Sequence, residues 1–312
     1  MGNQIGELIN IILSVLILIS VGFLSKKVGL LKKEHTAALN NIIIYLTMPA
    51  LIFRAIFEAK ISLSLINIPI LAIAIGSVSM AIAFVVGRFL RLRRPTLGAL
   101  ILVAAIGNTG YLGYPLTLQL FGLQNLVKAV FYDLAGTVVF TFTIGLIVAQ
   151  RYGESEGKVN ILKEMFTFPP LLGLFAALIP ALALKGIGLP KFLADTIGFL
   201  ADATVPLVML TIGLSLEPAR AKDYKLAIAV VILIKLFLTP LVALFSGVMV
   251  GMAGTDLGVI VLEASMPSFL LSLVIGLRYR LDIDFLATVI VVTTSLSMLT
   301  IPVWQYVLRA VI

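Results

Sequence analysis

Ten long apolar runs dominate the chain and constrain its fold more than any other feature. Each is about 20 residues long, the length an α-helix needs to cross the hydrocarbon core of a bilayer. With boundaries accurate to a few residues, the predicted spans are 5–25, 36–57, 66–90, 96–120, 126–149, 167–185, 192–216, 224–250, 256–278 and 283–308. Only 12% of the 312 residues are charged, against about a quarter in globular proteins. The sequence therefore predicts an all-α, multi-pass integral membrane protein with ten transmembrane helices.

Several function classes lack the residues that they need. The first apolar run carries Glu7 and lacks a cleavage site, so we interpret it as a retained helix rather than a signal peptide. The chain contains no cysteine, which excludes disulfides and thiolate chemistry. Its single histidine, His35, lies in a charged loop, and no GxxxxGK motif is present. These observations favour a protein that is not an enzyme and has no cofactor.

The basic residues are distributed unevenly between the predicted loops. Loops after the first, third, fifth, seventh and ninth spans hold sixteen cations, namely Lys26, Lys27, Lys32, Lys33, Arg88, Arg91, Arg93, Arg94, Arg151, Lys158, Lys163, Arg220, Lys222, Lys225, Arg278 and Arg280. The opposite side holds five, namely Lys60, Lys128, Lys185, Lys191 and Arg309. The positive-inside rule then predicts cytoplasmic odd-numbered loops and both termini outside. The net charge of +8 is thus a topology signal rather than a nucleic-acid footprint.

Short similarities suggest that the chain repeats itself. KKVGLLKK after the first span is echoed by LKGIGLPK after the sixth, TMP by TVP, and LAGTVVFTFT by LATVIVVTTS. These matches keep their order, at offsets of about 150–160 residues, as expected of inverted-topology repeats in transporters. We predict a first five-helix repeat over 1–150, a cytoplasmic linker over 151–165 and a second, inverted five-helix repeat over 166–312.

Two predicted spans are interrupted at mid-length by residues that break helices. GNTGYLGYP occupies residues 107–115, and EASMPSF occupies residues 263–269. Proline disrupts a helix interior but is well tolerated in a first turn. We therefore expect two half-helices in each span, the second beginning near Pro115 or Pro267. Irregular backbone at membrane depth persists only where protein or a wet cavity satisfies it. The breaks occupy matching repeat positions, so we predict that they cross at the midplane; simple proline kinks are the alternative.

A crossing of this kind predicts a site for a small organic anion. Half-helix N-termini would offer free N–H groups and positive dipole ends to a carboxylate. We expect Asn108 to contact the substrate directly. The predicted substrate-binding residues are Asn108, Thr109, Gly110, Tyr111, Gly113, Tyr114, Pro115, Ser265, Met266, Pro267 and Ser268.

Five charged side chains fall inside or near the ends of predicted spans. A charge at the bilayer centre costs about 2.5–3.5 kcal/mol on the mildest scales, so each is a functional candidate. Snorkelling or pairing near an interface would explain Arg54 and Asp133. A structural ion pair between Asp202 and Lys235 competes equally with a coupling role. Glu263, one turn before the proline of its break, could bind a proton or cation. The candidate residues for a coupling ion or proton are Glu263, Asp202, Lys235 and Asp133.

GNTGYLGYP resembles the fourth-helix motif of the auxin efflux carrier family, which includes the plant PIN exporters and many prokaryotic relatives. There an asparagine precedes the crossover proline by seven residues, as Asn108 precedes Pro115 here. Residues 263–304 are similar to the family's last two helices. The resemblance covers nearly the whole chain and implies an elevator transporter. Spans 1, 2, 6 and 7 would form a scaffold, usually dimeric, and the other six a mobile transport domain. Bacterial relatives resemble carriers of malate, malonate and similar anions.

Residues and resemblance together predict a secondary active transporter of small organic anions, either auxin-like or mono- and dicarboxylic acids. It would work by elevator-type alternating access, with a proton or sodium as the candidate coupling ion. The expected partners are the substrate, the lipid bilayer and a second copy in a homodimer, with no nucleic acid. The expected location is the cytoplasmic membrane. Two alternatives remain: a sodium-coupled symporter of the bile-acid type with the same architecture, and a membrane sensor that binds ligand without transporting it.

Overall fold

The computed structural model describes residues 2–32, 34–59, 62–154, 167–183, 188–216 and 224–311. Within these ranges the chain is helical, with one isolated bridge between two extended residues. Six described helical stretches are long and apolar enough to cross a membrane: His35–Phe57, Leu63–Phe89, Leu123–Tyr152, Lys191–Ser215, Lys225–Met249 and Ile283–Ala310. The chain is therefore an all-helical, multi-pass membrane protein.

Many of the long stretches contain π-helical turns, labelled η like the 3₁₀ turn η2. Up to residue 154 the elements are α1 (Gly2–Lys27), α2 (His35–Ile42), η1 (Ile43–Thr47), α3 (Met48–Phe57), η2 (Leu63–Ile66), α4 (Asn67–Phe89), α5 (Arg94–Ala105), η3 (Thr109–Gly113), α6 (Tyr114–Phe121), α7 (Leu123–Val130), η4 (Phe131–Val138), η5 (Thr141–Gly145) and α8 (Leu146–Tyr152). From residue 167 onward they are α10 (Pro169–Ala183), α11 (Lys191–Ser215), α12 (Lys225–Ile232), η7 (Leu233–Leu238), α13 (Thr239–Met249), α14 (Gly254–Ala264), α15 (Leu271–Tyr279) and α16 (Ile283–Val311).

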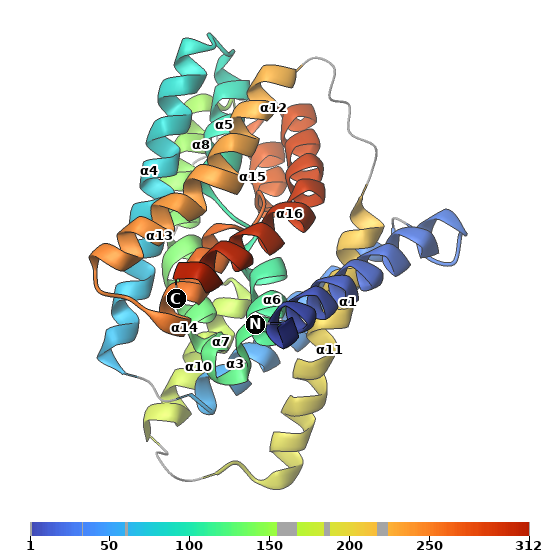
Figure 1. Cartoon of the computed structure of the whole chain (residues 1–312). Coiled ribbons are helices and arrows are strands. Elements are labelled where there is room, and N and C mark those ends of the chain that lie inside the picture. The colour runs from blue at the N-terminus through green and yellow to red at the C-terminus, as the bar shows by residue number, and fades with distance from the viewer. Residues whose placement is uncertain are drawn as a thin grey trace.

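The helices pack as two groups. In the first group, α1 and α3 pack against α11, α10 packs against α3, and α2 and η1 also contact α11. The second group contains α4 to α8 and α12 to α16, where α4 packs on α5 and η4, and α13 packs on α14. Figure 1 shows α1 and α11 crossing at one side of the molecule, away from α4 and α13. The first group consists of the same spans that the family resemblance assigns to a scaffold.

Two broken segments meet inside the second group. The first runs from α5 through extended residues into η3 and α6, and the second runs from α14 through an extended stretch into α15. Gly107 and Ser268 form an antiparallel bridge, in which Asn108 N donates to Pro267 O at 2.8 Å and Phe269 N to Ile106 O at 3.1 Å. In Figure 1, α5 and α15 lie above this junction and α6 and α14 lie below it. The bridge satisfies backbone groups that a membrane interior would otherwise leave unpaired.

The helical segments fall at the ten predicted apolar runs, and the predicted meeting of the two breaks is confirmed. The predicted restart near Pro115 agrees with α6, which begins at Tyr114 and holds Pro115 in its first turn, although the π-helical turn η3 precedes it from Thr109. The predicted restart near Pro267 is wrong. The second broken segment resumes at Leu271, and Pro267 stays in the extended stretch. Proline tolerates both a first helical turn and an extended strand, so its position alone does not fix where a helix begins.

Some predictions lie outside the described residues. Most of the proposed linker falls there, since residues 155–166 are not described. The same holds for residues 184–187, within the second copy of the first repeat similarity, and for seven basic residues used to assign topology, namely Lys33, Lys60, Lys158, Lys163, Lys185, Arg220 and Lys222.

Candidate substrate-binding site

A large cavity lies between the two helix groups. Its volume is about 680 Å³, within the range of ligand sites in proteins. The first group contributes wall residues from α2 and α11, including Asn40 and Ser215, and the second contributes residues from η3, α15 and α16. The first break reaches this cavity through Asn108 and Tyr111. The cavity is therefore positioned to hold a ligand that touches both groups.

Asn108 lines the cavity and carries an unpaired, buried amide oxygen. Its backbone is held in place, because its N–H donates to Pro267 and its carbonyl accepts from Leu112 N at 3.1 Å. Its side chain is only 4% exposed, and Oδ1 has no hydrogen-bond partner among the described residues. An unsatisfied buried polar atom is costly, and most are paired with protein, water or a ligand. The amide also has two N–H donors with which it can bind a carboxylate.

The other predicted residues of the first break have different roles. Tyr111 lines the cavity, and its hydroxyl donates to Asn40 Oδ1 on α2 at 3.3 Å. Thr109 and Tyr114 instead point to Asp133 on η4: Thr109 Oγ1 donates to Oδ1 at 2.5 Å and Tyr114 OH to Oδ2 at 2.7 Å. Pro115 is buried in α6. The break therefore has a cavity-facing side and a side that binds a buried carboxylate.

Three glycines spaced three residues apart in the first break lie against three buried charged side chains. A Cβ on Gly107 would lie 3.1 Å from Lys235 Nζ, and one on Gly110 would lie 3.0 Å from Asp133 Oδ2. One on Gly113 would collide with the carboxylate of Glu263. A side chain at Gly113 would displace the Glu263 carboxylate, whereas one at Gly107 or Gly110 would require the neighbouring charged group to move by a few tenths of an ångström. The charges come from three other helices, so the first break is the element around which they gather.

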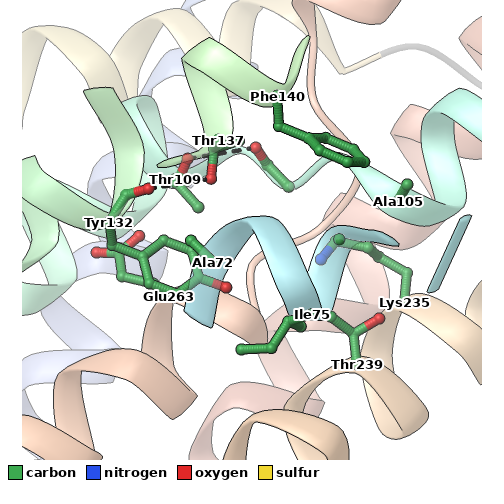
Figure 2. Close-up of a pocket in the computed structure, with 12 residues that line it drawn as sticks. Ala72, Ile75, Ala105, Thr109, Tyr132, Thr137, Phe140, Lys235, Thr239 and Glu263 are labelled. Carbon is green, nitrogen blue, oxygen red and sulfur yellow. Dashed lines mark hydrogen bonds between the residues drawn. The ribbon is translucent and has the colours of Figure 1, made fainter. Parts of the chain in front are cut away.

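A second, much smaller cavity is lined by Lys235 and Glu263, two charged residues from the second half of the chain. Its volume is about 10 Å³, enough for about one water molecule. Figure 2 shows Lys235 from η7 and Glu263 from α14 on opposite sides of the helix turn that carries Ala72 and Ile75, with Thr109 and Thr137 above Glu263. Lys235 Nζ donates to Ala264 O at 3.1 Å. Neither charged side chain is exposed by more than 2%.

Glu263 is only partly satisfied by the protein. Thr117 Oγ1 donates to its Oε1 at 2.9 Å, while Oε2 has no hydrogen-bond partner among the described residues. A buried carboxylate keeps its charge only if it is paired and hydrogen-bonded. The open oxygen therefore marks a place for a proton, a water molecule or a cation. In the described part of the chain, no three His, Cys, Asp or Glu residues are grouped as metal ligands.

The second break is closed by its own hydrogen bonds. Ser265 Oγ donates to Leu262 O and Ser268 Oγ donates to Val103 O, both at 2.7 Å. Ser268 N donates to Thr293 Oγ1 at 3.3 Å. These residues and Met266 are buried, and none of them, nor Pro267, lines the large cavity. Their predicted contact with substrate stays a prediction.

The structure rules out one of the two alternatives for Asp202 and Lys235, a structural ion pair between them. Asp202 Oδ1 accepts from Arg54 Nη1 at 2.9 Å, and the Asp202 side chain is 72% exposed. Lys235 lies in the small cavity with Glu263. Asp133 does not snorkel towards solvent, because it is 4% exposed and accepts two internal hydrogen bonds. Its short distance from a span end did not show which face of the helix the side chain occupies.

Sequence reasoning missed two polar residues of these sites. Thr117 donates to Glu263, and Asn40 accepts from Tyr111. Both are polar residues inside predicted spans, which is the only signal that could have found them. Thr141 and Thr143 donate to the carbonyls of Thr137 and Val139 one turn earlier in their own helix, as helical threonines commonly do.

This geometry defines a class of protein. Two broken helical segments joined at a buried crossing, with buried charges and a ligand-sized cavity beside them, are typical of membrane transporters.

Comparison with known proteins supports the assignment to membrane transporters. A family model described as "Membrane transport protein" matches residues 8–305. The Methanocaldococcus jannaschii protein named "Uncharacterized transporter MJ1031" is 36% identical over 304 residues, 96% of this chain and 98% of that protein. The Rhizobium meliloti protein named "Putative malonate transporter" is 27% identical over 97% of both chains. The Oryza sativa protein named "Probable auxin efflux carrier component 9" is 30% identical over 148 residues, covering 46% of this chain and 33% of that protein. The chain belongs to this family of membrane transporters, the auxin efflux carriers.

Proposed function

We propose that the chain is a secondary carrier of small organic anions that binds its substrate at the first break. The observation that carries this proposal is the position of Asn108. Asn108 lines a 680 Å³ cavity whose walls come from both helix groups, and its buried amide oxygen has no hydrogen-bond partner among the described residues. A carboxylate bound there would accept hydrogen bonds from the amide nitrogen and lie near the N-terminal end of the helical stretch that begins at Thr109. The name of the Rhizobium meliloti relative supports the same substrate class.

Transport then proceeds by an elevator movement of the second group past the first. The groups pack mainly within themselves, and the cavity follows the boundary between them, so a sliding movement would carry the first break and its ligand together. The cavity wall includes Thr36, Ser215, Leu277 and Asp284, which flank loops with an excess of basic residues. By the positive-inside rule these loops are cytoplasmic, so the cavity faces inward and both termini lie outside.

The architecture behind this movement is ten spans in two inverted five-helix repeats. The repeat similarities and the meeting of the two breaks support it. We further propose that the protein resides in the cytoplasmic membrane as a homodimer formed through the first group, as the family resemblance implies.

Glu263 is the candidate carrier of the coupling proton. It is fully buried, one oxygen is open, and it lines a cavity with room for about one water molecule. Lys235 lines the same cavity, so a charge change on Glu263 would alter the electrostatic environment of the Lys235 ammonium. Asp133 binds the first break through Thr109 and Tyr114 and couples the charged cluster to the substrate side.

Uptake into proteoliposomes tests the proposal. The purified protein is reconstituted, and influx of radiolabelled malonate, malate, acetate and other organic acids is measured at several pH values, with sodium or potassium as the only cation. We expect saturable influx of at least one acid, driven by a proton gradient without sodium. Thermal stabilisation by an acid without any influx would instead identify a sensor. Strict dependence on sodium would favour a symporter of the bile-acid type.

A further inference from the structure

A second, mostly apolar pocket adjoins the large cavity along the boundary between the two groups. Its volume is about 130 Å³. Apolar side chains from η1, α3, η4 and α15, with two loop residues, form most of its wall, namely Ile44, Met48, Val138, Phe168, Phe269 and Leu271. The polar residues that line it are Asn40, Tyr111 and Asp133. We call it the side pocket.

The side pocket and the large cavity share one wall. Both are lined by Asn40, Tyr111, Leu270 and Val274. The hydrogen bond from Tyr111 to Asn40 spans this wall and joins the two helix groups.

The order of residues along α2 and the elements after it shows the same arrangement. Thr36 and Asn40 line the large cavity, and Asn40, Ile44 and Met48 line the side pocket. Residues four apart lie on one helix face. The side pocket is therefore the next chamber along one continuous stripe, separated from the first by Tyr111 and Asn40.

We propose that the side pocket binds the apolar part of the substrate and that Tyr111 is a specificity-determining residue at its entrance. The inference rests on the proposed function, because it requires the carboxylate to bind at Asn108. Asn108 precedes Tyr111 by three residues, so a short molecule held at the amide can pass its chain beside the Tyr111 ring.

The dimensions and chemistry of the side pocket select a substrate class. A cavity of about 150 Å³ holds a molecule as large as benzene, so this pocket accepts a branched aliphatic group or a single small ring and excludes a bicyclic ring. A second carboxylate would lose its hydration among apolar walls, close to the buried carboxyl of Asp133. The selected substrates are monocarboxylates with one compact apolar group.

Uptake measurements with four probes test this selection. Proteoliposomes containing the intact chain are supplied with radiolabelled 3-methylbutanoate, acetate, malonate and indole-3-acetate. We expect the lowest KM for 3-methylbutanoate, at least tenfold below those for malonate and indole-3-acetate, since each well-packed methylene changes selectivity about tenfold or more.

Two variants change the pocket in opposite directions. Ile44→Phe fills it, and should raise the ratio of KM for 3-methylbutanoate to KM for acetate about tenfold. Met48→Ala enlarges it, and should lower the KM for indole-3-acetate. Ile179→Phe is the matched control, because Ile179 is 70% exposed on α10 and lines neither cavity. Tyr111→Phe removes the hydrogen bond to Asn40 but keeps the ring, and should weaken the discrimination against indole-3-acetate.

The outcomes separate this inference from the proposed function. Preference for malonate, with Met48→Ala and Tyr111→Phe leaving the selectivity unchanged, would overturn the side-pocket inference and leave an organic-anion carrier. Absence of influx for every acid would overturn both. If Ile44→Phe fails to fold, the Met48→Ala variant tests the inference alone. Its expected result is a lower KM for indole-3-acetate, and loss of structure cannot produce a lower KM.

Discussion

The two breaks of the chain have the same topology but opposite environments. The first, from Gly107 to Gly113, carries no charge of its own and faces a large cavity through Asn108 and Tyr111. The second, from Ser265 to Ser268, is buried and uses its serine hydroxyls to bind backbone carbonyls. The comparison shows that a shared backbone arrangement does not imply a shared role. We infer that the first break binds substrate and the second supports it.

The comparison also locates the charges. The three glycines of the first break lie against Lys235, Asp133 and Glu263. Lys235 and Glu263 line the small cavity and not the large one, whereas Asp133 lines the side pocket. In the proposed function, the carboxylate of the substrate and the charges of Lys235 and Glu263 lie on opposite sides of the first break. This is how a charge change could alter the position of Asn108 without direct contact with the substrate.

The largest expected effect is on the packing of the first break against Glu263. Gly113→Ala places a Cβ into the buried carboxylate, and overpacking of this kind costs about 1–3 kcal/mol. We expect a lower Tm and loss of uptake. The control is Gly198→Ala, where a Cβ would meet no atom within 4 Å. Equal Tm and full uptake in both variants would show that the close contact is unimportant.

Asn108→Ala tests the cavity side of the first break. A hydrogen bond to a charged group contributes about 1.5–3 kcal/mol, so we expect KM for the carboxylate to rise about 10- to 100-fold while Tm stays near the wild-type value. Asn67→Ala, at an exposed position at the start of α4, is the control for amide loss. A wild-type KM in Asn108→Ala would remove Asn108 from the binding site.

Glu263→Gln tests whether the buried carboxyl group next to the first break carries the coupling proton. Glutamine has nearly the same shape but cannot exchange a proton, so uptake should lose its dependence on pH, while KM at the wild-type optimum changes only a few-fold. Glu58→Gln is the control, because Glu58 is 51% exposed and pairs with Arg54. An unchanged pH profile in Glu263→Gln would assign coupling to another group.

The smallest expected effect belongs to the second break. Ser268→Ala removes one hydrogen bond to Val103 O and should lower the unfolding free energy by about 0.5–1.5 kcal/mol. KM should not change. The matched control is Ser295→Ala, an exposed serine that bonds its own helix. A rise in KM as large as that of Asn108→Ala would mean that the two breaks share the substrate.

Hydropathy and helix-breaking residues were enough to predict where the chain is helical and that the two breaks meet. Both follow from local composition, because lipid demands apolar side chains and internally bonded backbone. The contacts of individual charges did not follow. Asp202 pairs with Arg54 rather than Lys235, and this depends on how whole helices rotate and pack.

The side-chain contacts of the two breaks also could not be predicted from the sequence. A glycine permits many conformations. The glycines at residues 107, 110 and 113 therefore indicated a flexible backbone, but they did not indicate that three charged side chains lie against it. Tyr111 could be assigned to the site, yet its partner Asn40 lies 71 residues away, on a helix of the other group. Pairing across that distance is set by the tertiary fold alone.

The central claim is that the second group carries the first break past the first group during transport. Because the chain contains no cysteine, Asn40→Cys combined with Tyr111→Cys introduces the only two thiols, one on each side of the boundary. A reducible bifunctional thiol reagent should link them and stop counterflow of the transported acid, and a reductant should restore it to the rate of the unlinked double variant. Counterflow at an unchanged rate in the fully linked protein would contradict the claim.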